Sequence, residues 1–140
     1  MLQRIQTIWL LLASACAFLT MKLSFFSGNK LVNNQKQFES LTASSPGNLF
    51  LLILTVAVAI AALVLIFLYK DRKMQMKIAL IVLGLSLVNI FLFVSATEKF
   101  VEGTYDLTSP VAVAVPVFLL LAVRGIYKDE KLVKSVDRLR

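Results

Sequence analysis

Long apolar segments without charged residues constrain this chain more than any other feature. Residues 49–69 form a run of 21 positions with no ionised side chain, and residues 78–97 form a run of 20. A helix needs about 20 mostly apolar residues to cross a hydrocarbon core of roughly 30 Å. Residues 5–26 and 107–127 also qualify, the latter if Arg124 extends to the headgroups. The sequence therefore predicts an all-α fold with a bundle of four transmembrane helices.

Composition agrees with a membrane protein. Hydrophobic residues make up 59% of the chain and charged residues 16%, whereas ordinary soluble domains have about 45–50% and ~25%. The four spans occupy most of the 140 residues. We therefore expect a single integral membrane domain over residues 1–140, with a cytoplasmic tail at 128–140.

The distribution of basic residues predicts the orientation of the chain. The start, the connection after residue 69 and the tail together carry 11 Lys and Arg residues, while the other two connections carry four. Short cytoplasmic loops carry the excess of Lys and Arg, so both termini are expected in the cytoplasm. This asymmetry accounts for the net charge of +7, and no nucleic-acid partner is required.

Turn and cap residues indicate how the connections between the spans are folded. Residues 24–48 are polar and are expected to form a modest surface loop. Ser45-Pro46 and Ser109-Pro110 precede the second and fourth spans, where a serine cap followed by proline is favoured. These pairs predict where the two helices begin.

The first apolar segment also resembles a signal sequence. Arg4 precedes an apolar run, and Ala13-Ser14-Ala15-Cys16 imitates a cleavage site of small residues. The apolar run continues beyond Cys16, which favours a retained helix, although processing stays an alternative.

Several kinds of chemistry lack the residues they need. The chain has no histidine and one cysteine, so a His-ligated metal site and a paired-thiol redox site are excluded. Residues 5–21, 49–69 and 78–97 contain no charged residue, whereas proton-coupled transporters keep one at membrane depth. We predict no catalytic, cofactor-binding or metal-binding residues, and an enzyme acting on lipids is a remote alternative.

The expected packing residues are small or polar. The amide of Asn89 can hydrogen-bond to a neighbouring helix, and Ser86 lies on the same helical face. Ala57 and Ala61 on the second span offer a surface for close approach. We interpret these four residues as helix-packing positions and not as a ligand site.

The tail has the pattern of a short amphipathic helix. Apolar residues that include Leu132 and Val136 recur at helical spacing, and Glu130 and Lys134 form an i,i+4 pair. Such a helix can lie on anionic lipid or dock into a partner protein, and the sequence leaves both open. The candidate contact residues are Lys128, Lys131, Leu132, Lys134, Val136 and Arg138.

The two ends of the chain resemble a known family. Residues 1–13 read Met-Leu-Gln-Arg-Ile-Gln-Thr-Ile-Trp-Leu-Leu-Leu-Ala, and residues 128–140 read Lys-Asp-Glu-Lys-Leu-Val-Lys-Ser-Val-Asp-Arg-Leu-Arg. They are similar to a bacterial family of small four-helix integral membrane proteins that is known as a domain of unknown function. The resemblance implies a four-span protein of the bacterial inner membrane and transfers no catalytic residue.

These observations predict a noncatalytic membrane protein. We expect an anchor or accessory component that contacts membrane lipids, binds a partner complex through its cytoplasmic tail and requires no cofactor. The alternative function is an oligomeric transport or channel subunit, in which a homo-oligomer forms a pore lined by the Asn89 and Pro116 faces.

Overall fold

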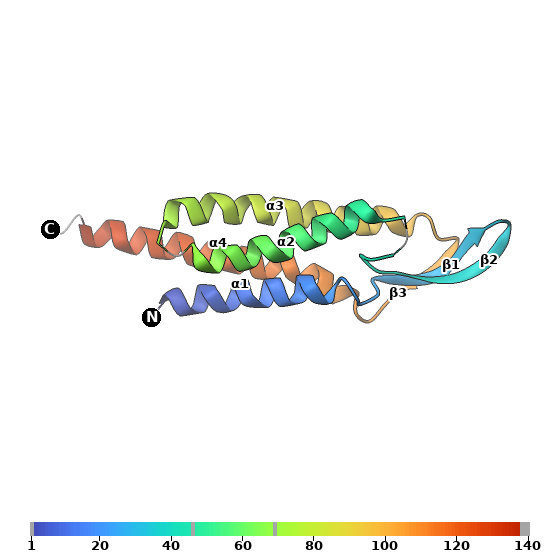
Figure 1. Ribbon diagram of the computed structural model, residues 1–140. Helices are drawn as coiled ribbons and strands as arrows, with labels where there is room; N and C mark the ends of the chain where they lie inside the picture. Colours follow the sequence, from blue (N-terminus) through green and yellow to red (C-terminus); the bar gives the residue numbers. More distant parts are fainter. Residues whose placement is uncertain (1, 46, 69, 138–140) are drawn as a thin grey trace.

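Four helices lie side by side and a small sheet extends from one end of them (Figure 1). The computed structural model describes residues 2–45, 47–68 and 70–137. The start of α1 and the end of α4 lie together at the end opposite the sheet (Figure 1). In chain order the elements are α1 (Leu2–Leu19), β1 (Phe26–Val32), β2 (Gln35–Leu41), α2 (Leu49–Phe67), α3 (Arg72–Thr97), β3 (Glu102–Tyr105) and α4 (Ser109–Asp137).

Three of these helices are long and apolar enough to span a membrane. They are Leu49–Phe67, Arg72–Thr97 and Ser109–Ser135, and Ile5–Leu19 in α1 is a shorter apolar helix. At 1.5 Å per residue, the 19 residues of α2 extend about 28 Å, and the 26 residues of α3 extend about 39 Å. Each of the three therefore matches or exceeds the thickness of a hydrocarbon core.

The first predicted span is too long by several residues. The helix ends at Leu19, where the backbone N–H groups of Lys22 and Leu23 donate to the Leu19 carbonyl. Residues from Phe26 onward belong to a strand. An apolar run at this position continues into a sheet because Phe25 and Phe26 are buried against other aromatic rings and not against lipid.

The expectation of a purely all-α fold is wrong, because three strands form an antiparallel sheet in the order β2-β1-β3. Residues 24–48 were expected to form a surface loop, but β1 and β2 form a hairpin in which Phe26 pairs with Leu41 and Val32 with Gln35. Asn33 and Asn34 connect them with φ values of 51° and 62°. A type I′ hairpin turn requires positive φ at both central positions, and asparagine tolerates it.

Aromatic rings hold the sheet against the helices. Phe25 contacts Phe93 of α3 with ring centroids 4.9 Å apart, and it meets the ring of Tyr105 edge-on at 5.7 Å. Phe26 packs edge-on against Phe100 and Tyr105, at 5.3 Å and 5.2 Å. Edge-to-face pairs at such distances add stability beyond the area they bury, so the sheet is fixed to the bundle.

Alanines share the space between the helices with larger apolar side chains such as Leu65 and Leu119, and many other large apolar side chains point outward. Ala13, Ala59 and Ala122 are fully buried, whereas Ile81 and Phe91 are 61% and 69% exposed. In water such exposed apolar residues would be unfavourable, but lipid tails solvate them. The exposed surface is therefore suited to a membrane.

The remaining helix bounds differ from the predicted spans at several ends. In α3 the helix begins at Arg72 and not at residue 78, and α4 runs from Ser109 to Asp137 without a separate tail helix. The cap of α2 is Asn48, and Ser45 instead accepts a hydrogen bond from the Thr42 N–H at 2.8 Å. Tyr69 and Pro46 lie outside the described residues.

We predict that Gly28→Ala destabilises the sheet. A Cβ at Gly28 would overlap the Glu102 carbonyl oxygen and lie 2.6 Å from the Gly103 Cα, so β1 and β3 would have to separate. We expect a loss of about 1–3 kcal/mol in the free energy of unfolding, measured in detergent by denaturant titration. The control is Gly84→Ala on α3, where a Cβ meets nothing within 4 Å. If both variants unfold alike, β1 and β3 do not pair as described.

Candidate functional site

The predicted packing residue Asn89 contacts the neighbouring helix α2. Its Nδ2 donates to Thr55 Oγ1 at 3.1 Å, and Thr55 is buried and also donates to the Leu51 carbonyl. Ser86, one turn before Asn89, is buried and donates to the Leu83 carbonyl at 2.7 Å. These polar groups are therefore used in packing α3 and are not directed at an open cavity.

Of the two predicted packing alanines of α2, Ala61 packs against the core of the bundle and Ala57 does not. Ala57 is exposed and Ala61 is half-buried, whereas Ala59 and Ala62 are buried in the bundle. Because α2 is apolar on all sides, its sequence does not indicate which alanine face turns inward. Contacts with α1 and α3 decide which face of α2 turns inward. One of them is the hydrogen bond from the Ser14 hydroxyl to the Ala59 carbonyl, at 3.1 Å.

A buried polar contact joins α1 to α4 at the end where α1 begins. Gln6 Nε2 donates to Asp129 Oδ2, and the two residues are only 7% and 6% exposed. Gly125 lies one turn before Asp129, and a Cβ there would come within 2.9 Å of Gln6 Cγ. Glycine thus leaves room for the glutamine side chain. We call Gln6, Gly125 and Asp129 the polar lock.

The start of α3 and the end of α2 are joined at the same end of the bundle. Arg72 donates to the backbone carbonyl of Asp129 at 3.4 Å, and buried Gln75 donates to the Leu65 carbonyl at 2.9 Å. The carbonyl of Leu65 belongs to the last turn of α2, where helical carbonyls lack an internal partner. All four helices are therefore linked by polar contacts within this region.

Beyond the polar lock, α4 continues for two turns with an exposed surface. The predicted pair is present, since Lys134 Nζ lies 2.7 Å from Glu130 Oε1. The candidate contact residues Lys128, Lys131, Leu132 and Lys134 are exposed. Val136 is within α4 but its side chain is outside the described part, and Arg138 lies beyond the described residues. We call Lys128, Lys131, Leu132, Val133 and Lys134 the tail surface.

A groove lies between the connection of α2 to α3 and the last turns of α4. Its volume is about 580 Å³, and four of its seven lining residues are basic. We call it the connection groove, and its lining residues are Lys70, Asp71, Arg72, Lys73, Glu130, Val133 and Lys134. This concentration of cations was not predicted from the sequence, because the basic residues come from two segments about 60 positions apart.

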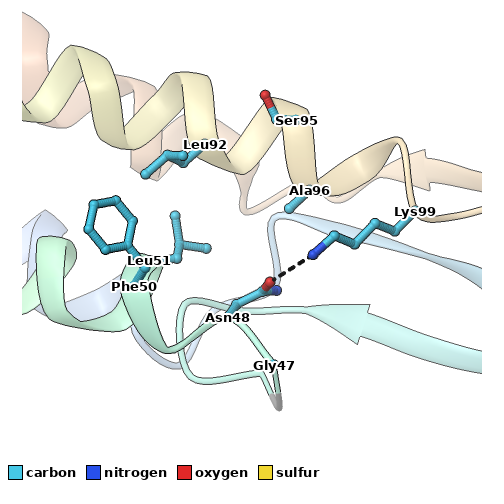
Figure 2. Close-up of a pocket in the computed structure, with 8 residues that line it drawn as sticks. All are labelled: Gly47, Asn48, Phe50, Leu51, Leu92, Ser95, Ala96 and Lys99. Atoms are coloured by element: carbon cyan, nitrogen blue, oxygen red, sulfur yellow. Dashed lines mark hydrogen bonds between the residues drawn. The ribbon is translucent and has the colours of Figure 1, made fainter.

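A smaller pocket of about 260 Å³ lies at the sheet end, between the start of α2 and the end of α3 (Figure 2). Its wall is largely apolar and includes Phe50, Leu51 and Leu92. The one cation in its lining, Lys99, donates to Asn48 Oδ1 at 3.5 Å (Figure 2). The pocket can therefore accept an apolar group, and two of its polar side chains, Lys99 and Asn48, are paired with each other.

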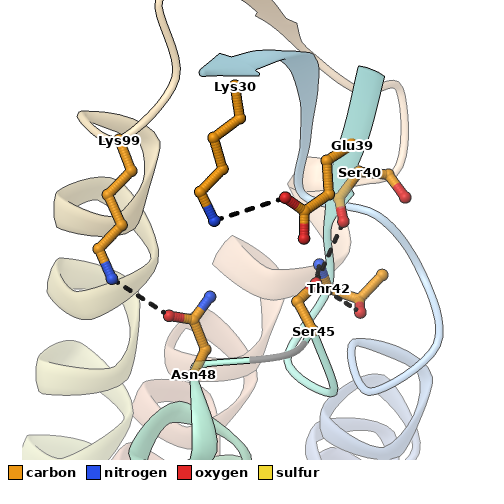
Figure 3. Close-up of polar contacts among 7 residues, drawn as sticks. All are labelled: Lys30, Glu39, Ser40, Thr42, Ser45, Asn48 and Lys99. Carbon is orange, nitrogen blue, oxygen red and sulfur yellow. Dashed lines mark hydrogen bonds and ion pairs between the residues drawn. The ribbon is translucent and has the colours of Figure 1, made fainter. Parts of the chain in front are cut away.

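The polar residues around that pocket stabilise the local structure. Lys30 lies 3.4 Å from Glu39 on the adjacent strand, and the hydroxyl of Ser45 donates to the Ser40 carbonyl at 3.1 Å (Figure 3). The first contact joins β1 to β2, and the second closes the turn between β2 and α2.

The carboxylates at the sheet end are also engaged. Glu102 lies 3.3 Å from Lys36, and Asp106 accepts a hydrogen bond from Ser27 at 2.6 Å. Across residues 2–45, 47–68 and 70–137, no three His, Cys, Asp or Glu side chains are grouped as metal ligands. The described residues thus offer packing surfaces and one basic groove.

Comparison with known proteins places the chain in a family. The sequence profile of a domain of unknown function matches residues 2–139, almost the full length. The chain belongs to the DUF4293 family. This confirms the resemblance inferred from the two ends. No curated protein and no solved structure matches this DUF4293 chain, so its function is argued from its own residues.

We predict that Gln6→Leu destabilises the bundle, because the Asp129 carboxylate would stay buried without its partner. A buried acceptor that loses its donor costs about 1–3 kcal/mol. The free energy of unfolding in detergent measures this loss. Gln37→Leu, at an exposed position of β2, is the matched control and should change it by less than about 0.5 kcal/mol. Equal stability of the two variants would contradict a buried polar lock.

Proposed function

We propose that this protein is a noncatalytic component of the bacterial inner membrane that crosses it four times and holds a partner complex at the cytoplasmic surface. Three helices have the length and apolar surface for spanning. The 18 residues of α1 extend about 27 Å. This length supports a fourth crossing, since α1 lies alongside the other helices over its whole length (Figure 1).

The basic residues support a cytoplasmic position for both ends of the chain. An even number of crossings returns the chain to its starting side, in agreement with the start of α1 and the end of α4 lying together (Figure 1). Lys70, Arg72, Lys73 and Lys77 connect or begin helices at that end, and the final turns of α4 add Lys128, Lys131 and Lys134. The positive-inside rule assigns such an end to the cytoplasm.

The proposed partner role is based on the end of α4, which extends past the other helices. The last turns of α4 extend past the ends of the other three helices (Figure 1), and Leu132 and Val133 are 51% and 43% exposed there. An exposed apolar pair flanked by lysines is typical of a helix that docks into a groove of a partner. The polar lock fixes the base of this segment, so the tail surface is presented in a constant orientation.

A transport or channel function would require several copies. The buried side chains between the helices of one copy are mainly alanine, leucine and valine, among them Ala62, Val82 and Leu119. These side chains fill the described interior, so a polar path would have to form between subunits. A homo-oligomer that moves solute is therefore the competing outcome of the experiment below.

We predict that a partner co-purifies through the tail surface. The full chain is purified from native membranes in mild detergent and compared with Lys131→Gln/Leu132→Gln, which leaves Asp129 and the polar lock intact, and with a chain ending at Tyr127. Label-free mass spectrometry should detect a partner protein with the full chain. The amount of that partner should fall about tenfold with both altered forms, since an exposed hot-spot pair contributes on the order of 1–2 kcal/mol.

The matched control is Leu31→Gln/Lys36→Gln, a cross-strand pair on the hairpin with a similarly exposed leucine. It should retain the partner, and a tag on that partner should recover this chain in return. If the full chain is isolated alone as a defined homo-oligomer, the docking proposal fails and solute flux in liposomes becomes the relevant assay.

A further inference from the structure

We propose that the connection groove binds the phosphate group of an anionic phospholipid from the surrounding membrane. The groove is lined by Lys70, Arg72, Lys73 and Lys134 against the two carboxylates of Asp71 and Glu130. Basic pockets between helices at the membrane surface bind the head groups of anionic lipids. This inference goes beyond the partner role, and the groove shares Val133 and Lys134 with the tail surface.

Two of the four cations are held in place by neighbouring groups. Lys134 Nζ lies 2.7 Å from Glu130, and Arg72 donates to the Asp129 carbonyl at 3.4 Å. These contacts anchor one basic side chain on α4 and one on α3. A phosphate that enters the groove would therefore meet cations whose positions are already set, which lowers the entropy lost on binding.

The other two cations have no such partner. Within the described residues, neither Lys70 nor Lys73 has a carboxylate within the 4.0 Å of an ion pair, whereas Lys30, Lys36 and Lys134 each have one. Lysine binds phosphate as a point charge, and arginine offers a planar pair of donors. Lys70 and Lys73 thus supply the positive charge that a phosphate would neutralise.

The position of the groove along the helices favours a lipid over a free phosphate. Lys70 follows α2 three residues after its end at Phe67, which is 77% exposed, and Met74 in the first turn of α3 is 55% exposed. If α2 and α3 span the membrane, these apolar side chains contact acyl chains while the lysines lie at the depth of the headgroups. Val133 adds an apolar contact inside the groove.

The smaller pocket at the sheet end does not offer the same site. Its apolar wall could contact an acyl chain, but its lining holds a single cation, Lys99, whereas the lining of the connection groove holds four. An anionic headgroup is therefore expected at the connection groove and not at the sheet end.

Lipid binding to the purified full chain in a neutral detergent tests the proposal. Native mass spectrometry follows titrations with phosphatidylglycerol, phosphatidylcholine and inorganic phosphate. We expect phosphatidylglycerol to bind at least about tenfold more tightly than phosphatidylcholine, and millimolar phosphate not to displace it. Equal binding of the two lipids would overturn the proposal, and displacement by phosphate would assign the groove to a free anion.

Charge variants locate the site. Lys70→Gln/Lys73→Gln should weaken phosphatidylglycerol binding by about 25-fold, because each near-surface cation contributes about fivefold. The control, Lys77→Gln/Arg124→Gln, removes the same charge from exposed positions outside the groove and should weaken binding by less than about threefold. Equal losses in the two variants would mean that general surface charge attracts the lipid.

A third variant separates lost binding from lost folding. Glu130→Gln removes a carboxylate from the groove and releases Lys134 from its ion pair, so phosphatidylglycerol should bind about fivefold more tightly. A damaged protein would not gain affinity. Unchanged or weaker binding by Glu130→Gln would contradict an anion site in the connection groove.

Discussion

Close approach of the helices through small side chains is the constraint on which the rest of this structure depends. Ala13, Ala59, Ala62, Ala79 and Ala122 are essentially unexposed, and helices that meet through alanine can gain packing energy without a hydrophobic driving force. Larger side chains such as Leu65 and Leu119 fill the rest of the core, and many others, such as Phe91, are directed outward to a surface suited to lipid. Polar groups at this depth are paired locally, as in the contact of Thr55 with Asn89, because an unsatisfied group in hydrocarbon costs several kcal/mol.

The two ends of the bundle are closed by different interactions. At the sheet end, Phe25 and Phe26 pack on Phe93, Phe100 and Tyr105, so a hairpin and a short third strand are joined to the helices by aromatic contacts. At the other end, the buried contact of Gln6 with Asp129 joins α1 to α4. Several polar residues of the sheet end are paired with each other, among them Lys30 with Glu39 and Lys36 with Glu102. The opposite end keeps exposed lysines on α4 and in the connection groove, and the proposed interactions are placed there.

The helices could be predicted from the sequence because their signal is local. Uncharged apolar runs of sufficient length occur at α2 and α3, and the run at α4 is long enough when Arg124 is included. The sheet was missed because β2 is polar on both faces and β1 is partly polar, so apolar and polar residues alternate only weakly along these strands. The adjacent Asn33 and Asn34 were the available signal of a turn. The polar lock joins residues 123 positions apart, and the connection groove combines two distant segments, so neither follows from local periodicity. The choice of Ala59 and Ala62 over Ala57 as inward residues depends on neighbouring helices, which a single apolar helix does not encode.

The most direct test of the central claim is the side of the membrane on which each end of the bundle lies. In a Cys16→Ser background, single cysteines are introduced as Gln35→Cys beside the hairpin turn and as Lys73→Cys at the start of α3, both at exposed positions. Intact bacterial cells are treated with a membrane-impermeant thiol reagent. We expect labelling of the hairpin cysteine in intact cells, and labelling of the α3 cysteine only after the membrane is permeabilised. The reverse pattern, or labelling of both in intact cells, would contradict a spanning bundle with its termini in the cytoplasm.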